Sequence, residues 1–238
     1  MNAGAVKRIR VWDLPTRLFH WLLVIAVAAA FISAKAGNLE AHALIGQGVL
    51  ALLVFRVAWG FLGSTHARFA QFVRGPSAIL AYLRGEWRGQ GHNPLGALSV
   101  LAFLAVLTLQ AVSGLFANDD STFFGPLYAL VSRDTSDLFA RIHHLQEPVI
   151  LALVLMHVAA IVFYVRFRRQ DLLRPMITGE RTLDPSAGDD TTARDASGGG
   201  WLALVLSLLL AGAAVYVARG DWIPPPPPPP VEDLPPAW

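Results

Sequence analysis

Long apolar segments separated by short polar links run through the chain of 238 residues. Five of them are long enough to cross a bilayer as helices, because a span needs about 20 mostly apolar residues. They cover residues 18–34, 42–61, 95–116, 139–165 and 201–218. A shorter apolar stretch at 76–84 begins with proline, which predicts an amphipathic helix at the membrane surface. The pattern predicts an all-α membrane protein.

The first segment follows the basic residues Lys7, Arg8 and Arg10, an order that is also found in cleaved signal peptides. However, His20 and Trp21 lie within it, and the segment is long for a signal-peptide core. We therefore expect it to be retained as the first of five spans.

The composition agrees with a polytopic membrane protein, since 54% of the residues are hydrophobic and only 15% are charged. The chain has no cysteine, which excludes iron–sulfur clusters, c-type haem attachment, disulfides and thiol catalysis. A redox centre would therefore be held by histidine, methionine or carboxylate side chains. Membrane lipid is an expected partner, and nucleic acid is not.

The distribution of basic residues predicts the orientation of the chain. Lys and Arg gather at the N-terminus, in the loop after the second segment and after the fourth, whereas the other links contain few of them. The positive-inside rule then places the N-terminus in the cytoplasm of a bacterial cell. Five spans put the C-terminal tail on the periplasmic side of the inner membrane, where prolines 224–230 would form an extended spacer.

The fourth segment carries a histidine near each end, His143 and His157, fourteen residues apart. The two side chains therefore lie within about 40° of each other on one helix face and roughly 21 Å apart along its axis. In the expected orientation, His20 matches the depth of His157 and His42 matches the depth of His143. Ionisable groups inside spans are costly and are usually functional. The spacing predicts one haem in each half of the membrane, each iron between two imidazoles.

Other interpretations of the histidines explain less. A histidine that hydrogen-bonds a neighbouring backbone carbonyl accounts for a single residue better than for two pairs at matched depth. Zinc needs ligands close together, and no Glu-x-x-His pair on the spans supports a di-metal carboxylate site. His144 points roughly 140° away from His157 and is not expected to ligate, although the choice between His143 and His144 stays open. His66 and His92 lie in loops, where a solvated or interfacial role is expected.

Three arginines lie within a turn or two of the expected haem edges: Arg17, Arg56 and Arg141. A guanidinium group matches a carboxylate, so each could bind a haem propionate. The alternative is that they extend to the lipid headgroups. Both interpretations are kept for Arg17 and Arg56, whereas Arg141 is the weaker candidate.

Five short motifs together resemble the bacterial cytochrome b561 family, which includes the cytochrome b subunits of nickel–iron hydrogenases. They are VWDLPTRLFHW at 11–21, FRVAWGFLGS at 55–64, ARF at 67–69, GHNPLG at 91–96 and PMITG at 175–179. The resemblance covers residues 8–181. It implies a four-helix core that binds two haems b through His20, His42, His143 and His157, and electron exchange between quinone and a partner redox protein. It leaves open whether His92 contacts quinone.

These expectations define four regions: a cytochrome b core at 1–181, a cytoplasmic linker at 182–200, an extra span at 201–218 and a proline-rich tail at 219–238. The leading hypothesis is a dihaem cytochrome that links the quinone pool to a periplasmic cytochrome or dehydrogenase subunit. One alternative is an oxidoreductase that oxidises a small reductant such as superoxide at a haem edge. Another is a haem-bearing anchor subunit of a dehydrogenase or hydrogenase complex. A homodimer is left open.

Overall fold

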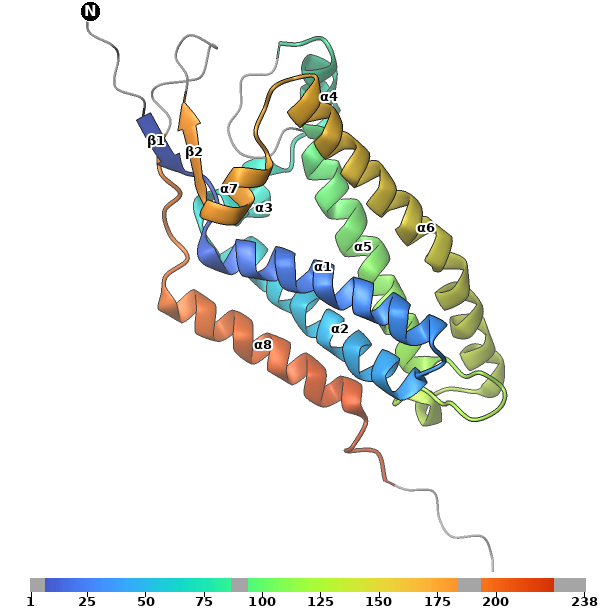
Figure 1. Cartoon of the computed structure of the whole chain (residues 1–238). Helices are drawn as coiled ribbons and strands as arrows, with labels where there is room; N and C mark the ends of the chain where they lie inside the picture. The colour runs from blue at the N-terminus through green and yellow to red at the C-terminus, as the bar shows by residue number, and fades with distance from the viewer. Residues whose placement is uncertain (1–6, 87–93, 184–193, 225–238) are drawn as a thin grey trace, which may run out of the picture.

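A computed structural model of the chain describes residues 7–86, 94–183 and 194–224. His92 and the proline tail from residue 225 onward, to which we assigned expectations, lie outside the described residues. Figure 1 shows five long helices, each long and apolar enough to cross a membrane. They are α1 (Leu14–Lys35), α2 (Leu39–Leu62), α5 (Pro94–Phe116), α6 (Arg133–Arg166) and α8 (Trp201–Arg219). They confirm the expected all-α membrane fold.

The short elements gather in the segments between the long helices. They are β1 (Lys7–Arg10), η1 (Thr65–Ala67), α3 (Phe69–Phe72), α4 (Pro76–Leu83), η2 (Tyr128–Leu130), α7 (Leu173–Thr178) and β2 (Glu180–Leu183). Helix α4 confirms the short helix expected at 76–84, and a hydrogen bond between the Tyr82 and Tyr164 hydroxyls joins it to α6. The antiparallel pairing of β1 with β2, which the sequence pattern did not predict, brings the N-terminal segment beside residues 180–183.

The starts of three long helices are set by polar side chains. Asp13, Asn38 and Ser132 each accept a hydrogen bond from a backbone N–H in the first turn of α1, α2 and α6 respectively. The cap at Ser132 explains why α6 starts at Arg133, ahead of the expected start at residue 139. Between α1 and α2 the chain reverses at Gly37, whose φ of 73° is a conformation that glycine adopts at little cost. The first two spans thus form a tight antiparallel hairpin.

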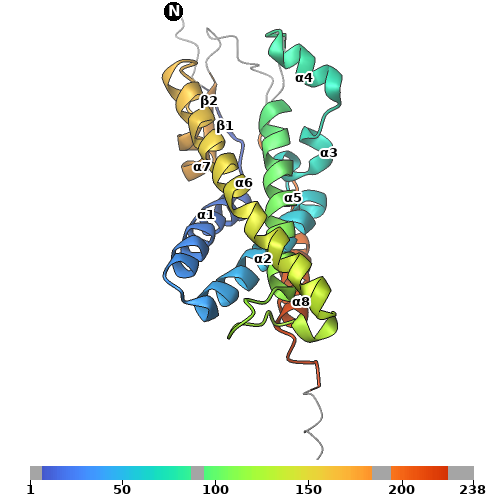
Figure 2. The same ribbon diagram turned by 90° about the vertical axis from the view of Figure 1, so that its right-hand side faces the viewer.

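The helices are arranged around α2, which packs against α1, α5 and α8, while α6 packs against α5. In Figure 1, α1, α2 and α8 run side by side, and α5 and α6 cross them steeply; Figure 2 shows α6 passing across α5. Side chains of α2, α5 and α6 meet in one apolar cluster, in which Leu53, Leu107 and Ile150 are almost completely buried. This cluster lies between the ends of the bundle that carry the histidines.

Helix α8 is part of this packing and does not stand apart from the bundle. Its Ala211 is buried in a cluster with Phe55 and Trp59 of α2. The segment that leads into α8 is attached to the loop after α2, because Thr65 donates from its backbone N–H to the Ser197 carbonyl at 2.8 Å. The fifth span therefore covers one face of α2.

Candidate functional site: two pairs of histidines

His42 and His143 face each other across the bundle. His42 lies in the first turn of α2, and His143 lies in the third turn of α6. Their ring centres are 5.9 Å apart and the ring planes are perpendicular, at 89°. His144 is exposed and its ring centre lies 6.1 Å from that of His143. Of the two neighbouring histidines, it is His143 that meets His42.

Both rings of this pair are oriented by carbonyl groups on another helix. The Nδ1 atom of His42 is 2.9 Å from the Ala30 carbonyl oxygen of α1, and that of His143 is 3.0 Å from the Gln110 carbonyl oxygen of α5. A carbonyl can only accept, so Nδ1 carries the proton in each ring. The lone pair of a neutral imidazole is then on Nε2, the atom that can ligate a metal. In His143 this atom lies 3.1 Å from the side-chain amide nitrogen of Gln110, which a metal would have to displace.

This arrangement fits an iron with two imidazole ligands. Metal–nitrogen bonds of about 2.0 Å place the centres of two coaxial imidazole rings roughly 6 Å apart, close to the separation of His42 and His143. A backbone acceptor on the second ring nitrogen is the usual support of a metal-binding histidine. Within the described residues, no group of three His, Cys, Asp or Glu side chains could hold a metal ion, so the arrangement is one of pairs and not of clusters.

The second pair consists of His20 in the second turn of α1 and His157 in the last third of α6. The two imidazoles are close enough to interact electrostatically. The ring of Phe103 meets His157 edge-on at 5.6 Å, and Trp21 meets His20 in the same way at 5.0 Å. The Nδ1 atom of His20 is buried and has no hydrogen-bond partner within the described chain. A buried imidazole with an unused nitrogen is suited to ligand binding.

The arginines that we considered as propionate partners have different surroundings. Arg56 is only 3% exposed, and its guanidinium group lies 5.3 Å from the centre of the Phe69 ring. One of its terminal nitrogens has no partner within the described chain, so it retains a donor for a ligand. Arg17 donates to the Ile177 carbonyl and keeps a buried, unpartnered Nε. Arg141 is exposed.

Arg17 takes part in a contact between two motifs that are far apart in the sequence. Sequence reasoning did not predict this contact. The backbone N–H of Val11 donates to the Gly179 carbonyl at 2.8 Å, and the Trp21 indole donates to the Met176 carbonyl at 3.2 Å. The motifs at 11–21 and 175–179 therefore lie against each other. The only signal in the sequence was their joint occurrence in the resemblance. This attachment fixes the segment of α1 that carries His20.

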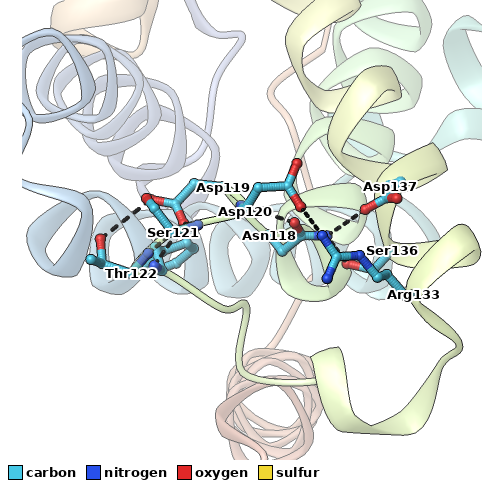
Figure 3. A network of polar contacts seen from close by, with 9 residues as sticks. Asn118, Asp119, Asp120, Ser121, Thr122, Arg133, Ser136 and Asp137 are labelled. Carbon is cyan, nitrogen blue, oxygen red and sulfur yellow. Dashed lines mark hydrogen bonds and ion pairs between the residues drawn. The ribbon is translucent and has the colours of Figure 1, made fainter.

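The loop between α5 and α6, at the end of the bundle where His42 and His143 lie, is rich in carboxylates (Figure 3). Asp119 accepts from three backbone N–H groups, those of Ser121, Thr122 and Phe123. Donation from Phe123 and Ser121 lowers the pKa of Asp119 to about 2. Asp120 forms an exposed ion pair with Arg133 at 2.7 Å. The loop is thus negatively charged and held in one conformation at neutral pH.

His66 lies in η1, away from both histidine pairs along the chain. Partial burial lowers the pKa of His66. The solvated or interfacial role that we expected for His66 stays a prediction.

Five helices long and apolar enough to cross a membrane, with two histidines that face each other across the bundle, are typical of a membrane cytochrome. Comparison with known proteins agrees, since the family model of prokaryotic cytochrome b561 matches residues 11–179. The chain belongs to this family, as its motifs predicted, and is a membrane b-type cytochrome that functions in electron transfer with haem b.

Curated relatives carry the same kind of description. A probable Ni/Fe-hydrogenase B-type cytochrome subunit of Rhizobium leguminosarum bv. viciae is 26% identical over 219 residues, which cover 74% of this chain and 91% of the relative. Proteins with the same description from Azotobacter vinelandii and Cupriavidus necator are 27% and 28% identical; each alignment covers 76% of this chain, and 91% and 90% of the relatives. No solved structure matches the chain at a significant level.

Proposed function

We propose that the chain binds two haems b, one between His42 and His143 and one between His20 and His157. The observation that carries the proposal is the closeness of His42 and His143, whose ring centres are 5.9 Å apart, a separation that suits two imidazoles that bind one iron. When bound, haem b supplies reversible one-electron transfer, and two imidazole ligands leave no iron position for oxygen or peroxide. Ligation of this kind favours electron transfer over oxygen chemistry.

The surrounding residues support this use of the bundle. The buried Leu53, Leu107 and Ile150 form an apolar layer between the two pairs and exclude water from the space between them. Arg56 and Arg17 retain unpartnered buried nitrogens, which suits them to propionate binding. A buried guanidinium nitrogen without an acceptor is costly, so an anionic ligand at Nη1 of Arg56 would stabilise the fold.

We further propose that electrons pass between the membrane quinone pool and a partner redox protein. The N-terminus lies in the cytoplasm and the C-terminal tail lies in the periplasm, on the basis of the basic residues in alternate links. The names of the relatives in three organisms favour a hydrogenase as the partner, in which case the chain also serves as a haem-bearing membrane anchor of the complex.

The decisive experiment measures haem per chain by the pyridine haemochrome method on the purified full chain and its variants. The unsubstituted chain should bind two haems b. The variants His42→Ala and His20→Ala should each retain one, because each removes one ligand of one pair. The matched control His144→Ala should retain both. One haem in the unsubstituted chain, or loss of haem in the control, would refute the assignment. Reduction of the haems by quinol tests the quinone link.

A further inference from the structure

Helix α5 contains no histidine, yet it makes the closest contacts to one of the proposed ligands. The Gln110 carbonyl holds Nδ1 of His143 at 3.0 Å, and the Gln110 side-chain amide lies 3.1 Å from Nε2 of the same ring. The Ser113 hydroxyl lies 3.4 Å from Nδ1. The imidazole of His143 is therefore seated against one turn of α5.

Gly114 lies in the same turn, directly beneath the ring. A Cβ atom at this position would lie 2.9 Å from Cε1 of His143 and 3.1 Å from Nδ1. These separations are shorter than ordinary carbon–carbon contacts of about 3.5–4.0 Å. The ring cannot simply move aside, because its Nδ1 is held by the Gln110 carbonyl. The His143 ring thus needs a residue without a side chain at position 114.

Glycine has the lowest helix propensity after proline, because it has no side chain and gains backbone freedom when unfolded. Gly114 lies in the last turn of α5, which ends at Phe116, so this cost is smaller there than in the helix interior. The φ of Gly114 is not in the left-handed region, so the backbone does not require glycine. The remaining reason for a glycine at position 114 is the space that the His143 ring occupies.

We propose that Gly114 is a positioning residue that sets the ring orientation of His143 and thereby the binding and the reduction potential of the haem at the His42–His143 pair. This inference rests on the proposed dihaem function, since it concerns how one of the two sites is built. In this proposal, α5 holds the His143 ring in place through Gly114 and the Gln110 carbonyl, although His143 itself belongs to α6.

A ring turned by about 30° from its preferred rotamer is disfavoured by up to about tenfold. We therefore expect Gly114→Ala to weaken haem retention at this site up to about tenfold, and Gly114→Val to weaken it further. A haem that is retained should show a shifted reduction potential and a shifted low-spin ferric electron paramagnetic resonance signal, because both report ligand orientation. The haem at the His20–His157 pair should be unchanged.

The test uses the full chain in two backgrounds. His20→Ala is expected to retain only the haem at the His42–His143 pair, and His42→Ala only the other. Adding Gly114→Ala to the first background should lower haem per chain or shift the potential and the resonance signal. Adding it to the second background should change none of them. The matched control is Gly48→Ala in α2, where a Cβ would have no atom within 4 Å.

The outcomes separate the two claims. If the single histidine variants do not each retain one haem, the proposed function fails and the inference with it. If they do, but Gly114→Ala leaves the haem, potential and signal unchanged in the His20→Ala background, only the inference is overturned. Loss of haem in both backgrounds would also overturn it, because the substitution would then act on the whole bundle and not on one ligand.

Discussion

Asp13 joins three parts of the chain and should be one of the residues on which the bundle most depends. One carboxylate oxygen accepts from the Thr16 backbone N–H at 2.7 Å and caps α1. The other accepts from the Trp59 indole of α2 at 3.0 Å and from the Ser64 hydroxyl in the loop that follows α2. Arg56 is close enough to interact with the Asp13 charge. Loss of this carboxylate should therefore loosen α1 from α2.

The size of the effect follows from the number of bonds. Removal of an N-cap costs about 1 kcal/mol. A buried donor left without its acceptor costs about 1–3 kcal/mol, and Trp59 and Ser64 are 1% and 3% exposed. Asp13→Ala should thus lower the free energy of unfolding by about 4 kcal/mol. Asp13→Asn has one carbonyl oxygen, which can keep the cap on α1 but leaves the Trp59 indole without its acceptor, so its cost should be about 1–3 kcal/mol.

The assay is thermal unfolding of the purified full chain in detergent, followed by haem absorbance. At the usual scale for a chain of this length, Asp13→Ala should lower the melting temperature by about 10 °C. The control is Asp195→Ala, whose carboxylate accepts one exposed bond, from the Arg10 backbone N–H, and which should change the temperature little. Equal melting temperatures for the two variants would refute the role of Asp13 as a joint between α1 and α2.

Two further predictions concern the α5–α6 loop and α8. Because its pKa is lowered to about 2, Asp119 stabilises its turn above about pH 4, and this stabilisation should be lost as the pH falls toward 2. The measurement is the protection factor of the Phe123 amide in hydrogen exchange, which should fall over this pH range. In Asp119→Asn this pH dependence should be absent. Ala211→Leu should overpack the contact of α8 with Phe55 and destabilise the chain by about 1–3 kcal/mol, without changing the number of haems per chain. The control is Ala213→Leu, at an exposed position of the same helix, which should not change the melting temperature. An unchanged protection factor of the Phe123 amide between pH 5 and pH 2, or loss of haem in Ala211→Leu, would contradict these statements.

The spans could be predicted from the sequence because the bilayer imposes a length and an apolar composition on each of them. The opposition of His42 and His143 was also predictable, since helix rise and loop length fix the depth of a residue in a hairpin. The pairing of β1 with β2 was not, because it joins two short, mostly polar stretches at opposite ends of the core. The bond from Arg17 to the Ile177 carbonyl was missed as well, because the depth of a residue in the membrane does not show which chain segment covers the end of a helix.

The family match ends at residue 179, before α8, and both histidine pairs lie within it. His42 of α2 is oriented by the Ala30 carbonyl of α1, and His143 of α6 by the Gln110 carbonyl of α5. Each of these two histidines is thus oriented by a helix other than its own, so the proposed haem site depends on the placement of four helices at once. All of these residues lie between 11 and 179. Helix α8 packs against the face of α2 that carries Phe55 and Trp59, and it supplies no histidine to either pair.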